Sequence, residues 1–327
     1  MKRVALFFGG LGNEAEVSIT SAVNIFKNFD HRRYKLICVY WHKDGFFYNV
    51  KSPKNLRVSA KNKLLIEDFR RHFDVALLMT HGRFGEDGII QGILEAQKIK
   101  YCGCRVLASA LCMDKAVCKE LFAGAKIRQT KFLSFDSAMN EKKDLAKFIS
   151  AVKKKLHCPV YVKPSNSGSS VGITKVDKFG RLKKAINLAF AHDQKILIEE
   201  GLVGPREIEV AVLGNKKLII SRPGEIKLAK DFYDYDDKYK LGQAQAIIPA
   251  SLPRVQIAQI RALAEKAYRL CGCSGFARID FFLYRGKIYL NEINTLPGFT
   301  DISMFPLLMM DQGMSYRQLI NKIIGLI

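Results

Sequence analysis

The chain has 327 residues, 48% hydrophobic and 26% charged, with a formal net charge of +22 from 53 basic and 31 acidic residues. Its length favours two or three domains, and its composition is normal for a soluble globular protein. The apolar run near the N-terminus, residues 4–8, is too short for a signal peptide or a membrane span, so we expect a cytoplasmic protein.

Residues 1 to about 105 alternate strands with helices, and this alternation predicts a parallel, doubly wound sheet. Ligands bind at the C-terminal ends of the strands in such sheets, where Gly9, Gly10, His81 and Gly82 fall. The predicted elements are a strand over 3–10, a helix over 16–29, strands over 35–42 and 74–82, and a helix over 88–97.

From about residue 106 the pattern changes to one helix and a series of β-rich segments. The loop over 230–245 has little apolar periodicity, and a loop of this length inside a compact domain is usually functional. The predicted elements are a helix over 107–125, strands over 131–135, 159–164, 172–176 and 195–202, and hairpins over 206–226 and 275–294 that turn at Gly214–Asn215 and Arg285–Gly286.

The excess of basic residues can indicate nucleic-acid or membrane binding, an anionic small substrate, or only a lysine-rich genome. The lysines are dense between residues 115 and 155, where the pattern is that of a helix with a solvated basic face. Aromatic residues do not interleave with these charges as they would in a stacking groove. We therefore expect neither nucleic acid nor a membrane as partner.

The eight cysteines include no C-x-x-C pair, and none has a histidine at zinc spacing. The two "CGC" pairs, at 102–104 and 271–273, are too close for an easy disulfide and too isolated in sequence for a tetrahedral metal site. We expect reduced, mostly buried thiols.

The second hairpin carries a cluster of hard oxygen ligands. Strand alternation places Arg278 and Asp280 on one face, and Glu292 and Asn294 share a face of the next strand. Convergence of these oxygens would suit Mg²⁺. The alternative is a salt-bridged sheet surface with Arg278 as partner, although burying such charges without a metal or phosphate would be costly.

The stretch "KPSNSGSSVGITKV", residues 163–176, is a glycine loop between two predicted strands. In the common nucleotide loop the lysine follows the last glycine, whereas here Lys163 precedes the loop. A hairpin with such a tip can fold over a triphosphate, with backbone N–H groups and lysines on the phosphates. Lys115 is a second candidate lysine, and an ordinary flexible loop is the alternative.

The combination resembles the ATP-grasp enzymes and, within them, the D-alanine–D-alanine ligases. The matching motifs run nearly end to end: "FFGGLGNEAEVSITSA", "HGRFGEDGIIQGILE", "CGCRVLASALCMDK", "VKPSNSGSSVG", "REIEVAVLG", "FYDYDDKY", "ARIDFF" and "NEINTLPGFTDIS". The resemblance implies an α/β fold, α+β in its C-terminal part, with three domains over 1–105, 106–200 and 201–327 and a mobile lid over 228–245.

The resemblance also implies ligation of two D-alanines through an acyl phosphate, with ATP converted to ADP and phosphate, for peptidoglycan synthesis. It implies two Mg²⁺ per site, with Mn²⁺ as a substitute, and a homodimer. The implied ligands of ATP are Lys115, Lys163, Ser169, Ser170, the adenine hinge Glu199, Glu200 and Leu202, the ribose ligand Glu207, and Lys238. The implied metal ligands are Asp280, Glu292 and Asn294.

For the amino acids, the resemblance implies Glu14 on the ammonium and His81 near the carboxylate of the first D-alanine. Arg278 and the Gly298 N–H would form an oxyanion hole. Ser303 and the Met304 N–H would hold the second carboxylate, and Ser169 and Tyr239 would link to Glu14 and close the lid.

A related ligase that makes D-Ala–D-lactate or D-Ala–D-serine is the alternative function. It would share the ATP site, and Tyr239 favours the dipeptide because lactate-forming relatives lack that tyrosine. Three positions depart from the family pattern, namely Ala15, Ser167 and Arg206, and none of them is an implied ligand.

Overall fold

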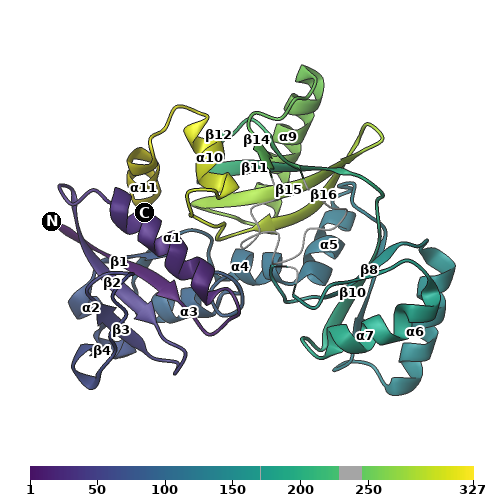
Figure 1. The fold of residues 1–327 in the computed structure, drawn as a ribbon, viewed down its shortest axis with the longest axis horizontal. Coiled ribbons are helices and arrows are strands. Elements are labelled where there is room, and N and C mark those ends of the chain that lie inside the picture. Colours follow the sequence, from purple (N-terminus) through teal and green to yellow (C-terminus); the bar gives the residue numbers. More distant parts are fainter. Residues whose placement is uncertain (170, 228–244) are drawn as a thin grey trace.

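The computed structural model describes residues 1–169, 171–227 and 245–327 (Figure 1). Within these residues the strands form three sheets, which lie in the ranges 2–102, 132–200 and 206–294. These ranges fall inside the three predicted domains, whose boundaries at 105 and 200 stay a prediction. None of the described helices is both long and apolar enough to cross a membrane.

The N-terminal sheet has the strand order β4-β3-β2-β1-β5-β6. The strands β2, β1, β5 and β6 are parallel, as predicted. The strands β3 and β4 add an antiparallel edge that the sequence pattern did not reveal. Only residues 42–46 separate β2 from β3, too few for a crossover, so the two strands form a hairpin. The strands are β1 (Lys2–Gly9), β2 (Tyr34–Trp41), β3 (Phe47–Val50), β4 (Lys63–Leu64), β5 (Val75–Leu78) and β6 (Lys100–Cys102).

The helices of this region pack on a sheet whose central strand is fully buried from Val4 to Phe8. Such a continuous apolar run is typical of a strand covered on both faces. The helical segments are α1 (Ala15–Asn28), η1 (Ala60–Asn62), η2 (Ile66–Asp68), α2 (Phe69–His72) and α3 (Ile89–Ala96).

The single helix predicted over 107–125 is wrong: the structure has α4 (Val106–Met113) and α5 (Lys115–Gly124), which are separated at Asp114. Asp114 has extended backbone dihedrals, and its carboxylate accepts a hydrogen bond from the Val117 N–H at 3.2 Å. An aspartate in this conformation caps the second helix, and the capping preference outweighs helical continuity here.

The second sheet is antiparallel, with the order β7-β10-β8-β9, and the helices α6 and α7 lie beside it in Figure 1. Its four strands are those predicted from the sequence. The elements are β7 (Phe132–Asp136), α6 (Lys142–Lys155), β8 (Val160–Pro164), β9 (Thr174–Val176), η3 (Phe179–Arg181), α7 (Leu182–Phe190) and β10 (Lys195–Glu200).

The third sheet has the order β14-β13-β11-β15-β16, with β12 paired to β11. Both predicted hairpins are confirmed, since β11 pairs β12 and β15 pairs β16 in antiparallel register. The elements are β11 (Arg206–Gly214), β12 (Leu218–Ile220), β13 (Gly224–Lys227), β14 (Gln245–Ile247), α9 (Arg254–Leu270), β15 (Phe276–Tyr284), β16 (Lys287–Asn294), α10 (Met304–Met310) and α11 (Tyr316–Ile324).

The C-terminal helix returns to the N-terminal sheet. Figure 1 shows α11 beside α1, and buried residues of α11, Leu319 and Ile323 among them, belong to the same apolar core as Val4. The last part of the chain is therefore packed against residues that the sequence assigns to a different domain.

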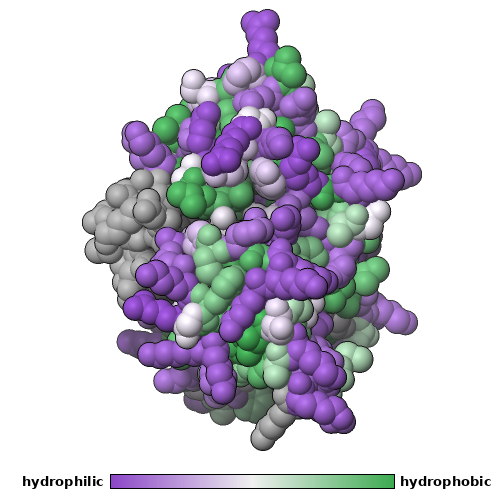
Figure 2. Space-filling model, turned by 90° about the vertical axis from the view of Figure 1, so that its right-hand side faces the viewer, coloured by the Kyte–Doolittle hydropathy of each residue, from purple (hydrophilic) through white to green (hydrophobic). Residues whose placement is uncertain are grey.

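Hydrophilic side chains cover most of the face in Figure 2, and hydrophobic side chains are scattered between them. Lys153, Lys154 and Lys155, at the end of α6, are exposed, as the predicted solvated basic face of that helix requires.

Candidate active site

A cavity of about 460 Å³ lies where the three sheets approach one another. Most of the residues predicted for catalysis and binding line it, although they come from distant parts of the chain. These lining residues are Glu14, His81, Lys115, Lys163, Ser169, Glu199, Glu200, Leu202, Glu207, Arg278, Glu292, Asn294 and Gly298.

The remaining predicted residues fall into two groups. Asp280, Ser303 and Met304 lie behind the lining: Asp280 contacts Arg278 and Asn294, and Ser303 occupies the N-cap position of α10 ahead of the buried Met304. Ser170, Lys238, Tyr239 and the lid predicted over 228–245, except its last residue, lie outside the described residues.

One wall of the cavity holds a buried carboxylate between two lysines. The Glu199 carboxylate lies 2.5 Å from the Lys163 Nζ and 2.6 Å from the Lys119 Nζ. Burial opposes the charge on Glu199, but the two ammonium groups lower its pKa to about 2. Burial likewise opposes the charge on Lys163, yet the Glu199 carboxylate raises its pKa. The two ammonium groups and the one carboxylate together carry a net charge of +1, beside the space in which a phosphate would bind.

Sequence reasoning missed Lys119, although a helical signal was present. Lys115 and Lys119 are four residues apart on α5, and residues at this spacing lie on the same face of a helix. Lys119 is also buried, which is rare for lysine without a partner.

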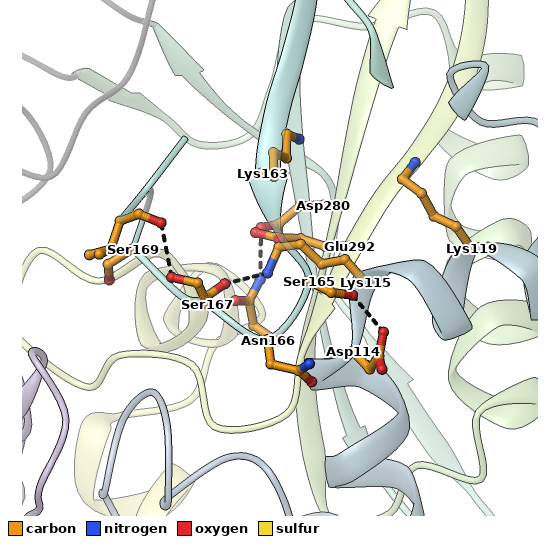
Figure 3. Close-up of polar contacts among 12 residues, drawn as sticks. Asp114, Lys115, Lys119, Lys163, Ser165, Asn166, Ser167, Ser169, Asp280 and Glu292 are labelled. Atoms are coloured by element: carbon orange, nitrogen blue, oxygen red, sulfur yellow. Dashed lines mark hydrogen bonds and ion pairs between the residues drawn. The ribbon is translucent and has the colours of Figure 1, made fainter. Parts of the chain in front are cut away.

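Lys115 reaches the predicted metal ligands from the first turn of α5. Its Nζ donates a hydrogen bond to the Ser167 carbonyl at 2.6 Å and lies 3.7 Å from the Glu292 carboxylate (Figure 3). The backbone of the same residue is anchored directly after β8, since the Lys115 N–H donates to the Ser165 carbonyl. This lysine thus joins the glycine loop to the acidic hairpin.

The acidic hairpin brings its three predicted ligands together. Asp280 is the cross-strand partner of Glu292, Arg278 is that of Asn294, and the Asn294 amide donates to Asp280 at 2.8 Å. The pairing register shifts after Asp280: Asp280 pairs with Glu292 but Phe281 pairs with Leu290, so Asn291 is an extra residue in β16. Asn291 lines the cavity. Period-two alternation along one strand could not predict this.

Arg278 balances the acidic charge of this hairpin. Its guanidinium donates two hydrogen bonds of 2.8 Å to Asp280 and lies 3.0 Å from the Glu209 carboxylate. Burial opposes its charge, but these carboxylates raise its pKa well above the ordinary value. The salt-bridge alternative is therefore correct for Arg278, while the oxygen-only set of Asp280, Glu292 and Asn294 fits a hard divalent cation. The metal-site hypothesis and the salt-bridge hypothesis therefore both apply to this hairpin.

Glu14 meets the glycine loop from the N-terminal sheet. The Ser169 hydroxyl donates a hydrogen bond to the Glu14 carboxylate. A Cβ at Gly168 would lie 2.7 Å from the same carboxylate, and a side chain at Gly82, whose φ is +74°, would collide with it. Both glycines are needed for this close approach.

Glu86 is a second carboxylate that sequence reasoning missed. It accepts hydrogen bonds from the Gly82 N–H at 2.9 Å and the Leu296 N–H at 3.1 Å. Burial, together with the nearby Glu14 carboxylate, raises the pKa of Glu86 to about 8. At neutral pH a proton on Glu86 relieves the repulsion between its carboxyl group and the Glu14 carboxylate.

His81 is buried, and both of its ring nitrogens have protein partners. Nδ1 lies 2.9 Å from the Leu296 carbonyl, which can only accept, so Nε2 accepts from the Ser21 hydroxyl at 2.9 Å. The Ser21 oxygen in turn accepts from the Phe299 N–H at 3.1 Å. Burial lowers the pKa of His81 to about 4, which agrees with a neutral ring in this chain of hydrogen bonds.

The loop after β16 places Gly298 beside Ser303. The Ser303 hydroxyl is 3.0 Å from the Thr300 N–H, and a Cβ at Gly298 would lie 2.8 Å from that hydroxyl oxygen. Glycine at 298 thus leaves room for the Ser303 hydroxyl directly behind the cavity lining, to which Gly298 belongs.

The far end of the cavity is bounded by the segment 199–207. Glu200 accepts a hydrogen bond from the His157 N–H at 3.1 Å, while Leu202 and Glu207 line the space. Arg206, a departure from the family pattern, forms two hydrogen bonds of 2.8 and 2.7 Å with Glu225 on the neighbouring strand β13. This arginine therefore braces the sheet next to Glu207.

Comparison with known proteins agrees with this geometry. Two family models match the chain: D-ala D-ala ligase N-terminus over residues 3–104 and D-ala D-ala ligase C-terminus over residues 121–325. A D-alanine–D-alanine ligase of Caldicellulosiruptor bescii is 42% identical over 346 residues, covering 99% of this chain and 94% of that protein. One of Chlorobaculum parvum is 42% identical over 348 residues, covering 98% and 95%.

Solved structures of ligases are similar over the same length. A D-Ala:D-Ser ligase from Enterococcus faecalis has a TM-score of 0.89 at 34% identity and covers 99% of both chains. The D-alanyl-alanine synthetase A from Vibrio cholerae has a TM-score of 0.84 at 30% identity, covering 99% of this chain and 97% of that one. With both family models matched in order and the motif residues gathered in one cavity, this chain belongs to the D-alanine–D-alanine ligase family.

Proposed function

We propose that the protein joins two molecules of D-alanine to D-alanyl-D-alanine for peptidoglycan synthesis, with ATP converted to ADP and phosphate, in the cavity between the three sheets. The observation that carries this proposal is the hydrogen bond from Ser169 to Glu14. It joins the glycine loop, a candidate phosphate ligand, to a buried carboxylate of the N-terminal region that can hold an ammonium. A nucleotide and an amino acid would thus lie next to each other.

ATP lies with its phosphates on the lysine wall. Lys163 and Lys115 contact the α- and β-phosphates, because both ammonium groups face the cavity and neither is fully neutralised by its carboxylate partner. The adenine occupies the segment Glu199 to Leu202, and Glu207 holds the ribose. The roles inferred for Ser170 and Lys238, on the β- and γ-phosphates, concern residues outside the described part of the chain.

As a member of its family the chain uses a divalent metal as well as ATP. Asp280, Glu292 and Asn294 would hold two Mg²⁺, with Mn²⁺ as a substitute, and the metal would supply charge to neutralise the phosphates. Lys115, beside Glu292, adds a fixed positive charge to the same region.

The charged and polar groups on the opposite side of the cavity bind the two amino acids. Glu14 binds the ammonium of the first D-alanine, which becomes the acyl donor after its carboxylate is phosphorylated. A carboxylate is a poor electrophile, and an acyl phosphate is a good one, so the second amine can attack it without a side-chain nucleophile. Arg278 and the Gly298 N–H stabilise the charge that develops on the carbonyl oxygen. Ser303 and the Met304 N–H hold the second carboxylate.

His81 acts in this scheme by positioning. Because both ring nitrogens are bonded to Leu296 and Ser21, the ring holds the loop that carries Gly298 in place beside the first substrate. A contact from His81 to the substrate carboxylate would require one of these bonds to break.

D-Serine is the second candidate acceptor, because the similar Enterococcus faecalis structure is that of a D-Ala:D-Ser ligase. A phosphate-release assay with Mg²⁺ and ATP should compare D-alanine alone, D-alanine with D-serine, D-alanine with D-lactate, and L-alanine, with products identified by mass spectrometry. We expect rapid release and D-alanyl-D-alanine with D-alanine alone. A mixed product in preference to the dipeptide would favour the alternative, and no release with D-alanine would refute the proposal.

The role of Glu14 can be tested with a matched pair of variants. Glu14→Gln should raise the KM for D-alanine strongly, whereas Glu16→Gln, an exposed carboxylate two residues further on in the first turn of α1, should leave it unchanged. Equal KM values would remove Glu14 from the substrate site. A homodimer and a cytoplasmic location complete the proposal, and light scattering of the purified chain tests the first of these.

A further inference from the structure

Five cysteines gather at one wall of the cavity, and Cys112 among them lines it. The Sγ atoms of Cys112, Cys118 and Cys271 all lie within 4.8 Å of one another, and the three residues are buried. They come from α4, from α5 and from the C-terminal end of α9. The sequence expectation of mostly buried free thiols holds. The CGC pair at 271–273 is isolated in sequence, but folding brings Cys271 beside two cysteines about 150 positions away.

A fourth thiol completes the cluster. Cys273, two residues after Cys271, packs against the same apolar core that contains Cys112, Cys118 and Cys271. The fifth, Cys104, is already engaged outside the triad, since its thiol donates to the Ser274 carbonyl at 3.4 Å. Cys273 is therefore the thiol best placed to act as a fourth ligand.

We propose that Cys112, Cys118, Cys271 and Cys273 form a thiolate site for a structural Zn²⁺. Tetrahedral zinc with Zn–S distances of about 2.3 Å separates its sulfur ligands by about 3.8 Å. The observed separations, none above 4.8 Å within the triad, need only small side-chain rotations to reach that value. Thiolates select soft cations, so this site differs in donor chemistry from the oxygen set of the acidic hairpin, which suits Mg²⁺.

The position of the cluster gives the metal a structural role. The break between α4 and α5 lies between Cys112 and Cys118, and Lys115 begins α5 directly after that break. A zinc ion held by both helices and by the end of α9 would fix the break against the third sheet. It would thereby hold Lys115 in the cavity without touching a substrate.

A path for the cation exists on two sides. Cys112 lines the large cavity, and Cys273 is only partly buried. Each thiol that binds must release its proton, so occupancy should fall as pH is lowered.

The test uses the full-length chain, reduced, stripped with a chelator and held at saturating Mg²⁺ so that the oxygen ligands are occupied. Titration with Co²⁺, a spectroscopic substitute for Zn²⁺, should give intense sulfur-to-cobalt charge-transfer bands that saturate at one equivalent per chain. Zn²⁺ should then displace Co²⁺ and abolish the bands. Absence of these bands, or saturation only at large excess, would overturn the proposal.

Variants and thiol protection locate the ligands. Cys271→Ser should abolish the bands, whereas Cys38→Ser, a buried thiol on β2 in a different core, should leave them intact. Should Cys271→Ser fail to fold, mass mapping of alkylation in the unaltered chain answers the same question. Zn²⁺ should protect the four proposed ligands and leave the labelling of Cys38 and Cys158 unchanged. Equal labelling of all eight thiols with and without Zn²⁺ would show that the cluster is only a group of core thiols.

Discussion

Glu199→Gln should destabilise the ligand-free protein far more than removal of either lysine that it binds. The Glu199 and Lys119 side chains are each only 4% exposed, and Lys163 shares the same carboxylate. The amide keeps the shape of Glu199 but removes the charge that compensates two buried ammonium groups. Uncompensated buried charges are expensive, and breaking such a pair costs about 3–5 kcal/mol.

The size of the effect also follows from the pKa of Glu199. The two lysines overcome the cost of burial and lower this pKa from 4.5 to about 2, which corresponds to about 3 kcal/mol in favour of the folded state. Because the folded-state pKa is depressed, this contribution is fully present above about pH 4.5 and is lost as the pH falls towards 2. Lys163→Met, in contrast, leaves the Lys119–Glu199 pair intact, so it should change stability little while weakening ATP binding.

Calorimetric unfolding at pH 7 measures the difference. With about 2–4 °C of midpoint per kcal/mol in domains of 150–250 residues, Glu199→Gln should melt several degrees below the parent. Glu120→Gln, an exposed carboxylate on α5, is the matched control and should melt with the parent. The difference in melting temperature between Glu199→Gln and Glu120→Gln should decrease as the pH is lowered below 4.5. Equal melting of both variants at pH 7, or a loss in Lys163→Met as large as in Glu199→Gln, would refute this account of the lysine wall.

Four further predictions concern the catalytic groups. Glu292→Gln should lower phosphate release by about two orders of magnitude or more, at an unchanged circular dichroism spectrum, because it loses an oxygen ligand of the metal; near-parental turnover would contradict that role. The ring-proton NMR signal of His81 should stay that of a neutral imidazole from pH 8 down to about 5, since burial lowers its pKa to about 4, and a midpoint near 6.5 would be inconsistent with the hydrogen-bond chain. Ser169→Ala removes one hydrogen bond to Glu14, worth about 1 kcal/mol, so kcat/KM for D-alanine should fall about fivefold, and an unchanged value would separate the loop from the substrate site. Tyr239→Phe should raise the ratio of depsipeptide to dipeptide with D-lactate and D-alanine as competing acceptors, most clearly below neutral pH, where more of the amine is protonated; identical ratios for variant and parent at two pH values would limit Tyr239 to lid packing.

The parts of the site that local patterns encode could be predicted from the sequence. Period-two alternation placed Arg278 with Asp280 and Glu292 with Asn294, and the register of β15 on β16 confirms both faces. The turn residues of that hairpin were equally visible, because Arg285–Gly286 interrupts two apolar runs. The register shift that brings Asn291 to the cavity depends on the pairing of two strands, and no single-strand pattern contains it.

Other features could not be predicted because they depend on contacts with residues distant in the sequence. The helix break at Asp114 is stabilised by the Ser165 hydroxyl at 2.6 Å and the Lys195 Nζ at 2.7 Å. Ser165 directly follows β8, and Lys195 begins β10, so both partners belong to the second sheet or its edge. The apolar periodicity of residues 107–125 continues through the break, so it predicted one helix. Lys119 likewise looks like a surface lysine until Glu199 lies opposite it.

The loop after β16 shows why local patterns cannot supply the rest of the site. Its backbone is held by groups more than 200 residues away: the Leu296 carbonyl by His81, the Leu296 N–H by Glu86, and the Phe299 N–H by Ser21. Gly298 lies between these anchored residues, so the position of its N–H depends on the N-terminal sheet. The Tyr316 hydroxyl of α11 also donates to the Phe299 carbonyl, and α11 packs on the same core as that sheet. The proposed oxyanion donor, the Gly298 N–H, is therefore held through contacts with the N-terminal region that also carries Glu14, the proposed ligand of the first ammonium. Such contacts would set the distance between the two groups before either substrate binds.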